Sequence, residues 1–105
     1  MTAEAALFRT LADPTRRAVF ERLGEGEMTV SDLRQGFTVS QPAISQHLAA
    51  LKAAGLVSER RAGRNAYYRL RPEGLAPLAS WVDRYRTFWP ERIGKLKDLL
   101  KDMDQ

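Results

Sequence analysis

The chain has 105 residues, of which 44% are hydrophobic and 29% are charged, a balance typical of one globular domain and not of a disordered chain. It contains no cysteine, which excludes disulfides, thiolate metal sites and thiol redox sensing, and one histidine leaves little scope for imidazole chemistry. The formal net charge of +4 and the pI of about 9.9 fit a partner that carries phosphates, although a basic pI alone does not establish one. With no apolar run long enough to span a bilayer and no signal-peptide pattern, we expect a cytoplasmic protein without membrane contact.

Two helices are predicted at the N-terminal end. Residues 3–11 are rich in alanine and have large apolar residues at helical spacing. Asp13 then caps a second helix, with Pro14 at its first position and Gly24 at its end.

The next two segments predict a helix-turn-helix. A helix of about two turns is expected within residues 28–37, where Thr29 and Asp32 have the spacing of a capping box. Ser40 caps a longer helix, which ends before Gly55. Because few residues separate the two helices, they must be joined by a sharp turn.

The helix after Ser40 has two different faces. Ile44, Leu48 and Leu51 form one apolar stripe that we expect to be buried. The opposite face is small, polar and free of acidic groups, which suits approach to base edges and phosphates, although an ordinary solvated face has a similar composition. The residues of this helix that we expect to contact DNA are Ser40, Gln41, Ser45, Gln46 and Lys52.

A strand-like rhythm follows and predicts a β-hairpin with glycine and asparagine at its tip. Five arginines lie in residues 59–71 against one acid, Glu59, which predicts a concentrated positive charge. Surface hairpins also carry charge for solubility and to block edge pairing, but such charges tend to mix signs. The hairpin residues expected to hold phosphates or to reach a neighbouring minor groove are Arg60, Arg61, Arg64 and Asn65.

The last third of the chain is predicted to be helical and is unusually apolar, with Pro90 breaking or kinking the helix. Either this stripe folds back onto its own core or it pairs with a second chain. We favour a homodimer, because the exposed stripe would otherwise be a large hydrophobic patch. The residues expected at the dimer interface are Leu7, Leu78, Val82, Tyr85, Trp89, Ile93, Leu96 and Leu100.

Together these elements predict a mainly α fold with a small β-hairpin, a winged helix-turn-helix. We expect one domain over residues 1–105, with a DNA-reading core at about 28–71 and dimerisation helices at about 3–11 and 74–104. The N- and C-terminal helices would form the dimer interface.

At the residue level the chain resembles the ArsR-type (arsenic-repressor-like) bacterial transcriptional regulators over roughly residues 5–75. The segments that carry the resemblance are L-A-D-P-T-R at 11–16, S-Q-P-A-I-S-Q-H-L at 40–48, L-K-A-A-G-L-V at 51–57, and G-R at 63–64 with Y-Y-R-L at 67–70. The resemblance implies a cytoplasmic homodimer that binds a double-stranded operator near its own promoter and represses transcription until an effector releases it.

The same comparison predicts that no metal or other cofactor is bound. Metal-sensing members open the third helix with C-V-C-D-L, whereas residues 29–33 here read T-V-S-D-L. A second family site uses Asp, His and Glu on the C-terminal helices, where this chain has no histidine. His47 is expected to pack on the preceding helix or to bond a phosphate. The effector, if there is one, is not identified.

We do not expect catalysis, since no catalytic set of residues and no phosphate-cradling loop is recognisable. Two other functions remain open. An unknown small molecule or protein bound at the C-terminal helices would gate DNA binding. Alternatively, the winged helix would serve protein–protein contact, which predicts salt-insensitive binding and no loss on removal of Arg64.

Overall fold

The computed structural model describes residues 2–88, which form five α-helices and one small antiparallel sheet. The helices are α1 (Ala3–Ala12), α2 (Pro14–Arg22), α3 (Val30–Arg34), α4 (Gln41–Ala53) and α5 (Ala76–Asp83). The strands are β1 (Met28–Thr29), β2 (Val57–Ala62) and β3 (Asn65–Leu70), in the order β1-β3-β2. The prediction of a mainly helical fold with a small β element is confirmed. No helix of the described part of the chain is long and apolar enough to cross a membrane.

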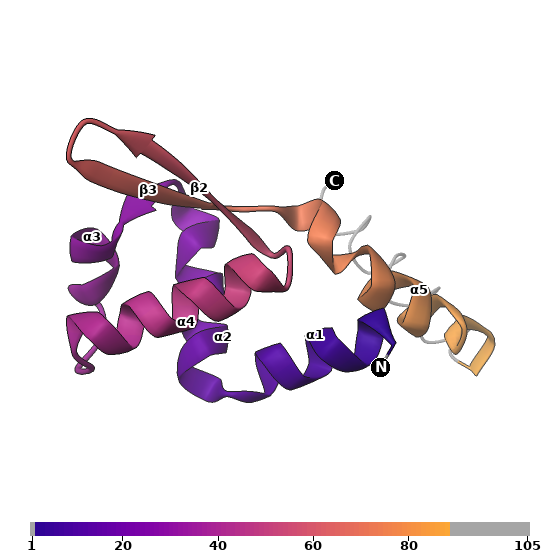
Figure 1. The fold of residues 1–105 in the computed structure, drawn as a ribbon. Helices are drawn as coiled ribbons and strands as arrows, with labels where there is room; N and C mark the ends of the chain where they lie inside the picture. Colours follow the sequence, from indigo (N-terminus) through magenta and orange to yellow (C-terminus); the bar gives the residue numbers. More distant parts are fainter. Residues whose placement is uncertain (1, 89–105) are drawn as a thin grey trace, which may run out of the picture.

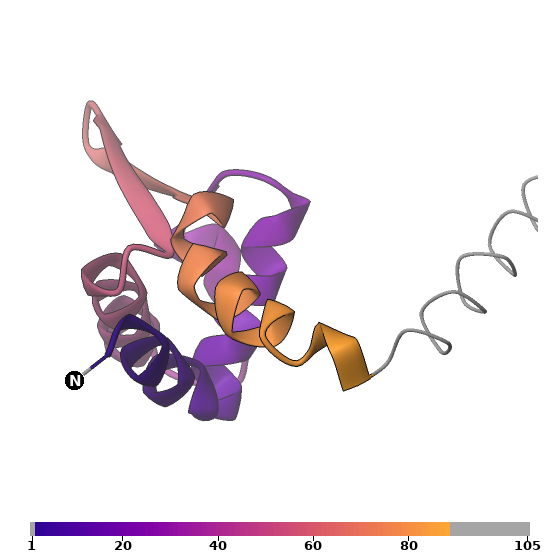
Figure 2. The ribbon, with the colours of Figure 1, turned by 90° about the vertical axis from the view of Figure 1, so that its right-hand side faces the viewer.

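The elements separate into two ends (Figure 1). The β2–β3 hairpin, α3 and the start of α4 lie together at one end, and α1 packs beside α5 at the other. Figure 2 shows that the hairpin projects beyond the body of helices. The outermost part of the hairpin is therefore free to contact a partner that also touches α4.

The corner between α1 and α2 is closed by polar contacts. The Asp13 carboxylate accepts a 2.9 Å hydrogen bond from the Arg16 amide and so caps α2, as predicted. The Arg17 guanidinium donates to the Leu11 carbonyl at 2.8 Å, which satisfies an end carbonyl of α1. The L-A-D-P-T-R segment thus has a structural role at this corner.

The core lies between the helices and the inner face of the sheet. Each helix from α1 to α4 contributes one or more buried apolar side chains, and the predicted stripe of α4 is entirely buried. Leu7 is 3% exposed and packs in this core, so it offers a second chain almost no surface and does not fit the predicted interface. The buried core residues are Leu7, Val19, Leu23, Leu33, Ile44, Leu48, Leu51, Leu56 and Val57.

The segment expected to be one helix within residues 28–37 is divided between a strand and a shorter helix. Met28 and Thr29 pair with Tyr68 and Tyr67 of β3, and the helix runs only from Val30, directly after the predicted cap Thr29, to Arg34. The predicted capping box is present, because Thr29 and Asp32 exchange side chain to backbone hydrogen bonds of 3.1 and 3.2 Å.

The hairpin has a two-residue turn. Ala62 pairs with Asn65, which leaves Gly63 and Arg64 between the strands. Gly63 has φ +63°, and no other residue type in the described chain has positive φ, which fits a type II′ turn with glycine at its first central position. Such turns match the twist of the strands, so the tip is well defined.

The C-terminal stripe breaks earlier than Pro90, the position predicted for the kink. Helix α5 ends at Asp83, the Tyr85 amide bonds to the Val82 carbonyl three residues back, and a 3-10 turn follows at Arg86–Phe88. The tighter hydrogen bonding ends the α-helical spacing that we had expected to continue. Pro90 and the predicted interface residues Trp89, Ile93, Leu96 and Leu100 lie outside the described residues.

Candidate nucleic-acid interface

Helix α4 presents its polar residues from a firmly anchored position. The Ser40 hydroxyl accepts a hydrogen bond of 3.3 Å from the Ala43 amide, and Gly55 with φ +78° ends the segment as predicted. Burial of the apolar stripe fixes the rotation of the helix, because the opposite face must then point outward. Exposed residues on that side include Gln41, Ser45 and Gln46.

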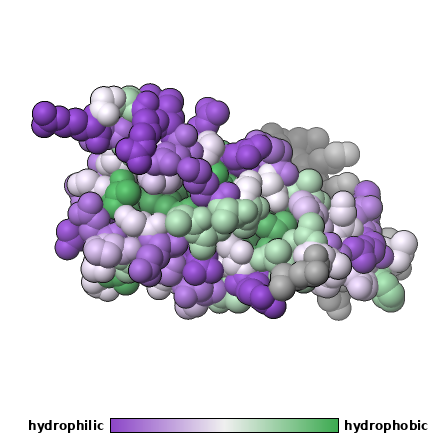
Figure 3. Space-filling model, in the orientation of Figure 1, coloured by the Kyte–Doolittle hydropathy of each residue, from purple (hydrophilic) through white to green (hydrophobic). Residues whose placement is uncertain are grey.

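All nine residues predicted to contact DNA are exposed, and they lie on α4, at its N-cap Ser40 and on the hairpin. Figure 3 shows hydrophilic side chains covering the projecting hairpin. Helix α3 packs against α4, so the two helices and the hairpin form one continuous unit. The nine residues are Ser40, Gln41, Ser45, Gln46, Lys52, Arg60, Arg61, Arg64 and Asn65.

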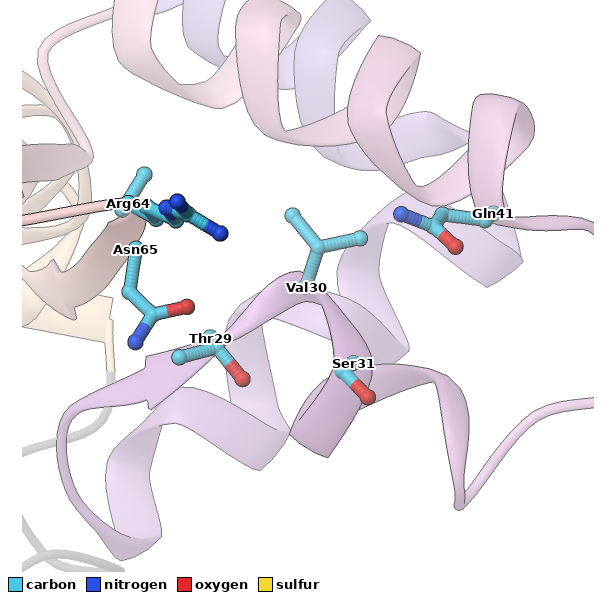
Figure 4. Close-up of a pocket in the computed structure, with 7 residues that line it drawn as sticks. Thr29, Val30, Ser31, Gln41, Arg64 and Asn65 are labelled. Carbon is cyan, nitrogen blue, oxygen red and sulfur yellow. The ribbon is translucent and has the colours of Figure 1, made fainter.

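A hollow of about 230 Å³ lies between the hairpin tip and the starts of α3 and α4 (Figure 4). Gln41 reaches its edge from α4, and Arg64 and Asn65 reach it from the hairpin. The side chains of Arg64 and Gln41 point toward each other above Val30 in Figure 4. Arg64 forms no ion pair with any residue of the described chain. The structure thus brings Gln41, predicted to read bases, next to a cation that has no carboxylate partner in the described part of the chain.

Sequence reasoning missed the contribution of α3 to this hollow. Thr29 and Ser31 are among the residues that line it, together with Val30 and Ala66. These are the positions at which a metal-sensing relative would carry thiolates, and hydroxyls are poor ligands for soft metals. No cluster of three or more His, Cys, Asp or Glu side chains within residues 2–88 is arranged to hold a metal ion.

The positive charge of the hairpin is less concentrated than the sequence predicted. Lys52 Nζ lies 2.9 Å from Glu59 Oε1, and Arg61 Nη2 lies 3.7 Å from Glu59 Oε2. Arg60 Nη2 lies 2.6 Å from Glu27 Oε1. The sequence analysis counted Glu59 as the one opposing acid, but it did not show that Glu59 contacts two cations at once or that Glu27, outside the hairpin, pairs with Arg60.

Arg60 forms a strap across the outer face of the sheet. It lies on β2, its guanidinium carbon is 4.8 Å from the centre of the Tyr67 ring on β3, and it reaches Glu27 just before β1. The Arg60 hydrogen bond lowers the pKa of the Glu27 carboxyl. Arg60 therefore braces all three strands and is not a free phosphate ligand in this structure.

Glu59 lies on the inner face of the sheet, where it joins α4 to the hairpin. It accepts hydrogen bonds from Lys52 Nζ at 2.9 Å and from the Tyr68 hydroxyl at 3.2 Å, and its side chain is only 16% exposed. The bond from Lys52, and then that from Tyr68, lower the pKa of the Glu59 carboxyl. Partial burial, followed by the charge of Glu59, raises the pKa of Tyr68.

His47 is half-buried at the edge of the apolar stripe of α4. Its Nδ1 atom is shielded from solvent and has no hydrogen-bond partner among the described residues. The Arg16 amide, and to a smaller extent the charge of His47, lower the pKa of Asp13. Helix α2 packs against α4, whereas the prediction for His47 was packing on the preceding helix, α3, or a bond to a phosphate, and both remain predictions.

Helices α1 and α5 lie at the opposite end of the molecule from the hairpin tip (Figure 1), and the surface that they form carries exposed apolar side chains. Phe8 and Trp81 meet edge to face at 5.0 Å, and the ring series continues through Tyr85 to Phe88. Phe8, Val82 and Tyr85 are 45%, 45% and 40% exposed, whereas the predicted interface residue Leu78 is partly buried against the core. Phe8, which is beside Leu7 in the sequence, was not among the predicted interface residues.

A capped helix with an exposed polar face, preceded by a short helix and a sharp turn and flanked by a basic β-hairpin, defines a winged helix-turn-helix protein. A helix-turn-helix domain family matches residues 11–60. The chain belongs to the ArsR family of winged helix-turn-helix transcriptional regulators.

Individual relatives agree with this assignment. The chain is 49% identical over 80 residues to the HTH-type transcriptional regulator Rv2034 of Mycobacterium tuberculosis, which is 76% of this chain and 75% of the relative. It is 38% identical over 76 residues to the transcriptional repressor SdpR of Bacillus subtilis, covering 72% of this chain and 84% of the repressor. The solution structure of a homodimeric winged helix-turn-helix DNA-binding domain from Mycobacterium bovis, a possible ArsR-family regulator, matches with a TM-score of 0.65 and 30% identity over 81% of this chain and 79% of that one.

Proposed function

We propose that the protein is a homodimeric transcriptional repressor that binds an inverted-repeat DNA operator through α4 and the hairpin. The observation that carries this proposal is the exposed polar start of α4 beside Arg64 at the hairpin tip, which has no ion-pair partner within residues 2–88. Helix α4 offers polar groups for the base edges, and the hairpin tip offers positive charge for the phosphate backbone of the DNA. The membership in the ArsR family and the repressor among the relatives support the same reading.

Base recognition is assigned to Gln41, Ser45 and Gln46. They lie in the first two turns of α4, and a glutamine can make a bidentate contact to adenine in the major groove. The first turns of such a helix are the part that reaches base edges when the helix enters the groove. None of the three side chains forms a hydrogen bond within residues 2–88, so each is available to a ligand.

Binding of the DNA phosphate backbone is assigned first to Arg64 and Asn65. They face the hollow next to α4, so a phosphate held there would fix the register of the helix on the duplex. A narrow minor groove next to the site would attract the same arginine. Ser40 and the positive end of the α4 dipole would add to phosphate binding, whereas Lys52, Arg60 and Arg61 must first leave or share their carboxylate partners.

Dimerisation is assigned to the α1–α5 surface. Exposed aromatic residues there leave an apolar area that a second copy would cover, while the hollow remains open at the other end of the molecule. In a two-fold dimer the two α4 helices would read half-sites about one helical turn, roughly 34 Å, apart. The absence of thiolates in residues 29–33 supports regulation that does not use a metal.

Selection of bound duplexes from a random DNA library, with the full chain at one fixed salt concentration, tests the proposal. We expect an inverted repeat, and we expect Gln46→Ala to lose about 1–3 kcal/mol of discrimination at one base position in each half-site. Gln35→Ala, which removes an exposed glutamine outside α4 and the hairpin, is the matched control and should leave the selected sequence unchanged. Failure to enrich any sequence, or binding that does not depend on salt, would favour a protein-contact module.

A further inference from the structure

Glu59 is the one acidic residue between Leu56 and Arg71, and it lies among the cations that the DNA interface would use. Its two carboxylate oxygens are divided between partners. Oε1 accepts from Lys52, and Oε2 accepts from Tyr68 and lies 3.7 Å from Arg61. A single carboxylate thus holds one cation from the last turn of α4 and one from the hairpin.

The ion pairs of the two cations with Glu59 are weak. The side chains of Lys52 and Arg61 are 53% and 78% exposed, and exposed ion pairs contribute little to stability because water and salt screen them. Glu59 itself is 16% exposed and is further fixed by the Tyr68 hydroxyl. The carboxylate is therefore the fixed member of the cluster, and the cations are the members that can turn toward another anion.

A DNA phosphate would compete with Glu59 for these cations. Each phosphate neutralised by Lys or Arg releases condensed counterions and so adds to the salt dependence of binding. A cation that stays paired with Glu59 contributes little to the release of counterions from the DNA. If the cation leaves Glu59 for a phosphate, the carboxylate is left without a counter-charge and repels that phosphate. A phosphate bound by Lys52 or Arg61 would lie close to Glu59, where salt screens the repulsion only in part.

We propose that Glu59 is an intramolecular competitor of the DNA backbone, which holds Lys52 and Arg61 and thereby limits the affinity of the protein for all DNA sequences. This inference rests on the proposed function and adds a negative determinant to the DNA-binding face. It assigns Tyr68 the task of keeping the carboxylate in place. The effect is on the strength of binding and not on the bases selected, because Glu59 lies beside the phosphate ligands and away from Gln41 and Gln46.

The variant Glu59→Gln separates the charge of this residue from its shape. Glutamine has nearly the same size, its carbonyl can accept from Lys52, and its amide can donate to the Tyr68 oxygen. The link between α4 and the hairpin is thus preserved while the negative charge is removed. Asp83→Asn is the matched control, because it also removes one carboxylate from an ion pair, with Arg86, but on α5 at the far end of the molecule.

The experiment measures the dissociation constant of the full chain for its selected operator and for an unrelated duplex across a series of salt concentrations. For Glu59→Gln we expect binding that is about 3–10-fold tighter on both duplexes near 0.1 M salt, with a log–log salt slope steeper by about 0.9 for each phosphate gained. Asp83→Asn should change neither quantity by more than about 1.5-fold, since screening removes most of the effect of a distant charge. In a Lys52→Gln/Arg61→Gln background, adding Glu59→Gln should give no more than the change seen with the control.

Equal binding by Glu59→Gln and Asp83→Asn overturns the inference, as does a gain that persists in the Lys52→Gln/Arg61→Gln background. Weaker binding by Glu59→Gln with an unchanged melting temperature also overturns it and makes Glu59 a residue that binding requires. Glu59→Thr is a second neutral variant, and if both neutral variants fail to fold, Glu59 is a folding residue and the inference is wrong. If the wild-type chain enriches no DNA at all, the proposed function fails first and independently of these variants.

Discussion

Arg84 donates a 2.8 Å hydrogen bond from Nη2 to Glu4 Oε1, joining the end of α5 to the first turn of α1 across 80 residues of sequence. The same two helices carry the edge-to-face contact between Phe8 and Trp81. The apolar surface proposed to pair with a second copy is thus assembled from both ends of the described chain. Its geometry depends on a charged contact as well as on aromatic packing.

Acid should weaken this junction. Hydrogen bonding to the backbone amide of Glu4, and then to Arg84, lowers the pKa of the Glu4 carboxyl below its ordinary value. A carboxyl group whose pKa is lower in the folded state stabilises the fold above its unfolded pKa, about 4.3, and the stabilisation is lost as the pH falls through the folded pKa. Urea unfolding at fixed protein concentration should therefore show a smaller loss of stability between pH 6 and pH 3 for Glu4→Gln than for the wild type. Glu21→Gln, an exposed position on α2 without an ion pair in residues 2–88, should follow the wild type, and a Glu4→Gln profile that does the same would contradict the prediction.

Arg64→Ala should weaken binding to every DNA sequence without changing the bases selected. Arg64 lies at the hollow without a carboxylate partner in the described chain, so its charge is available to phosphate. Loss of one phosphate contact should make the log–log salt slope shallower by about 0.9. Titration of labelled duplexes at several salt concentrations measures this slope. Arg9→Ala, which removes the same charge from α1, should leave the slope unchanged, and a changed base preference for Arg64→Ala would place the residue on a base edge instead.

Replacing the exposed apolar residues of α1 and α5 should shift the protein toward monomer. Phe8→Ser together with Val82→Ser removes two side chains that are each 45% exposed, so the covered area of a dimer falls, while the fold of one chain loses mainly the contact of Phe8 with Trp81. Analytical ultracentrifugation over a range of concentrations measures the change. The control Tyr67→Ser alters an aromatic residue on the hairpin and should leave the association constant unchanged. An unaltered dimer of the Phe8/Val82 variant would mean that the interface lies elsewhere.

Leu48→Ala should destabilise the domain by about 3 kcal/mol, because Leu48 is fully buried in the core beneath α4 and the truncation leaves a cavity. Urea denaturation with the midpoint and slope fitted separately gives the change in free energy of unfolding. Ser45→Ala on the exposed side of the same helix should stay within about 0.5 kcal/mol of the wild type. A similar loss for both variants would indicate that α4 is anchored by something other than its apolar stripe.

Helix α4 was predictable because its cap, its proline in the first turn, its apolar spacing and its terminal glycine are all local signals that agree. Strand β1 was not, since two residues have no periodicity and their pairing partners, Tyr68 and Tyr67, lie about forty residues later. The spacing of apolar residues also could not tell Leu7, which faces its own core, from its exposed neighbour Phe8. That distinction depends on where α5 packs.

In the candidate site too, features set by neighbouring residues in the sequence could be predicted, whereas contacts between distant segments could not. Exposure of all nine predicted DNA contacts followed from the orientation of α4 and the hairpin. The pairing of Arg60 with Glu27 spans 33 residues and needed the order of the strands in the sheet. The sequence thus identifies which residues are basic, but it does not show which of them already form ion pairs with a carboxylate of the same chain.

The two-residue turn of the hairpin restricts how the length of this element can change. Side chains alternate between the two faces of β2 and β3, so Glu59 and Tyr68 share one face while Arg60 and Tyr67 share the other. One extra residue in either strand would exchange these faces or force a bulge, and one extra pair at the tip would turn Arg64 away from the hollow. The hairpin can therefore lengthen and keep Arg64 on the side of the hollow only in steps of four residues. An insertion of two residues should turn Arg64 away from the hollow, and an insertion of four should return it to the same side.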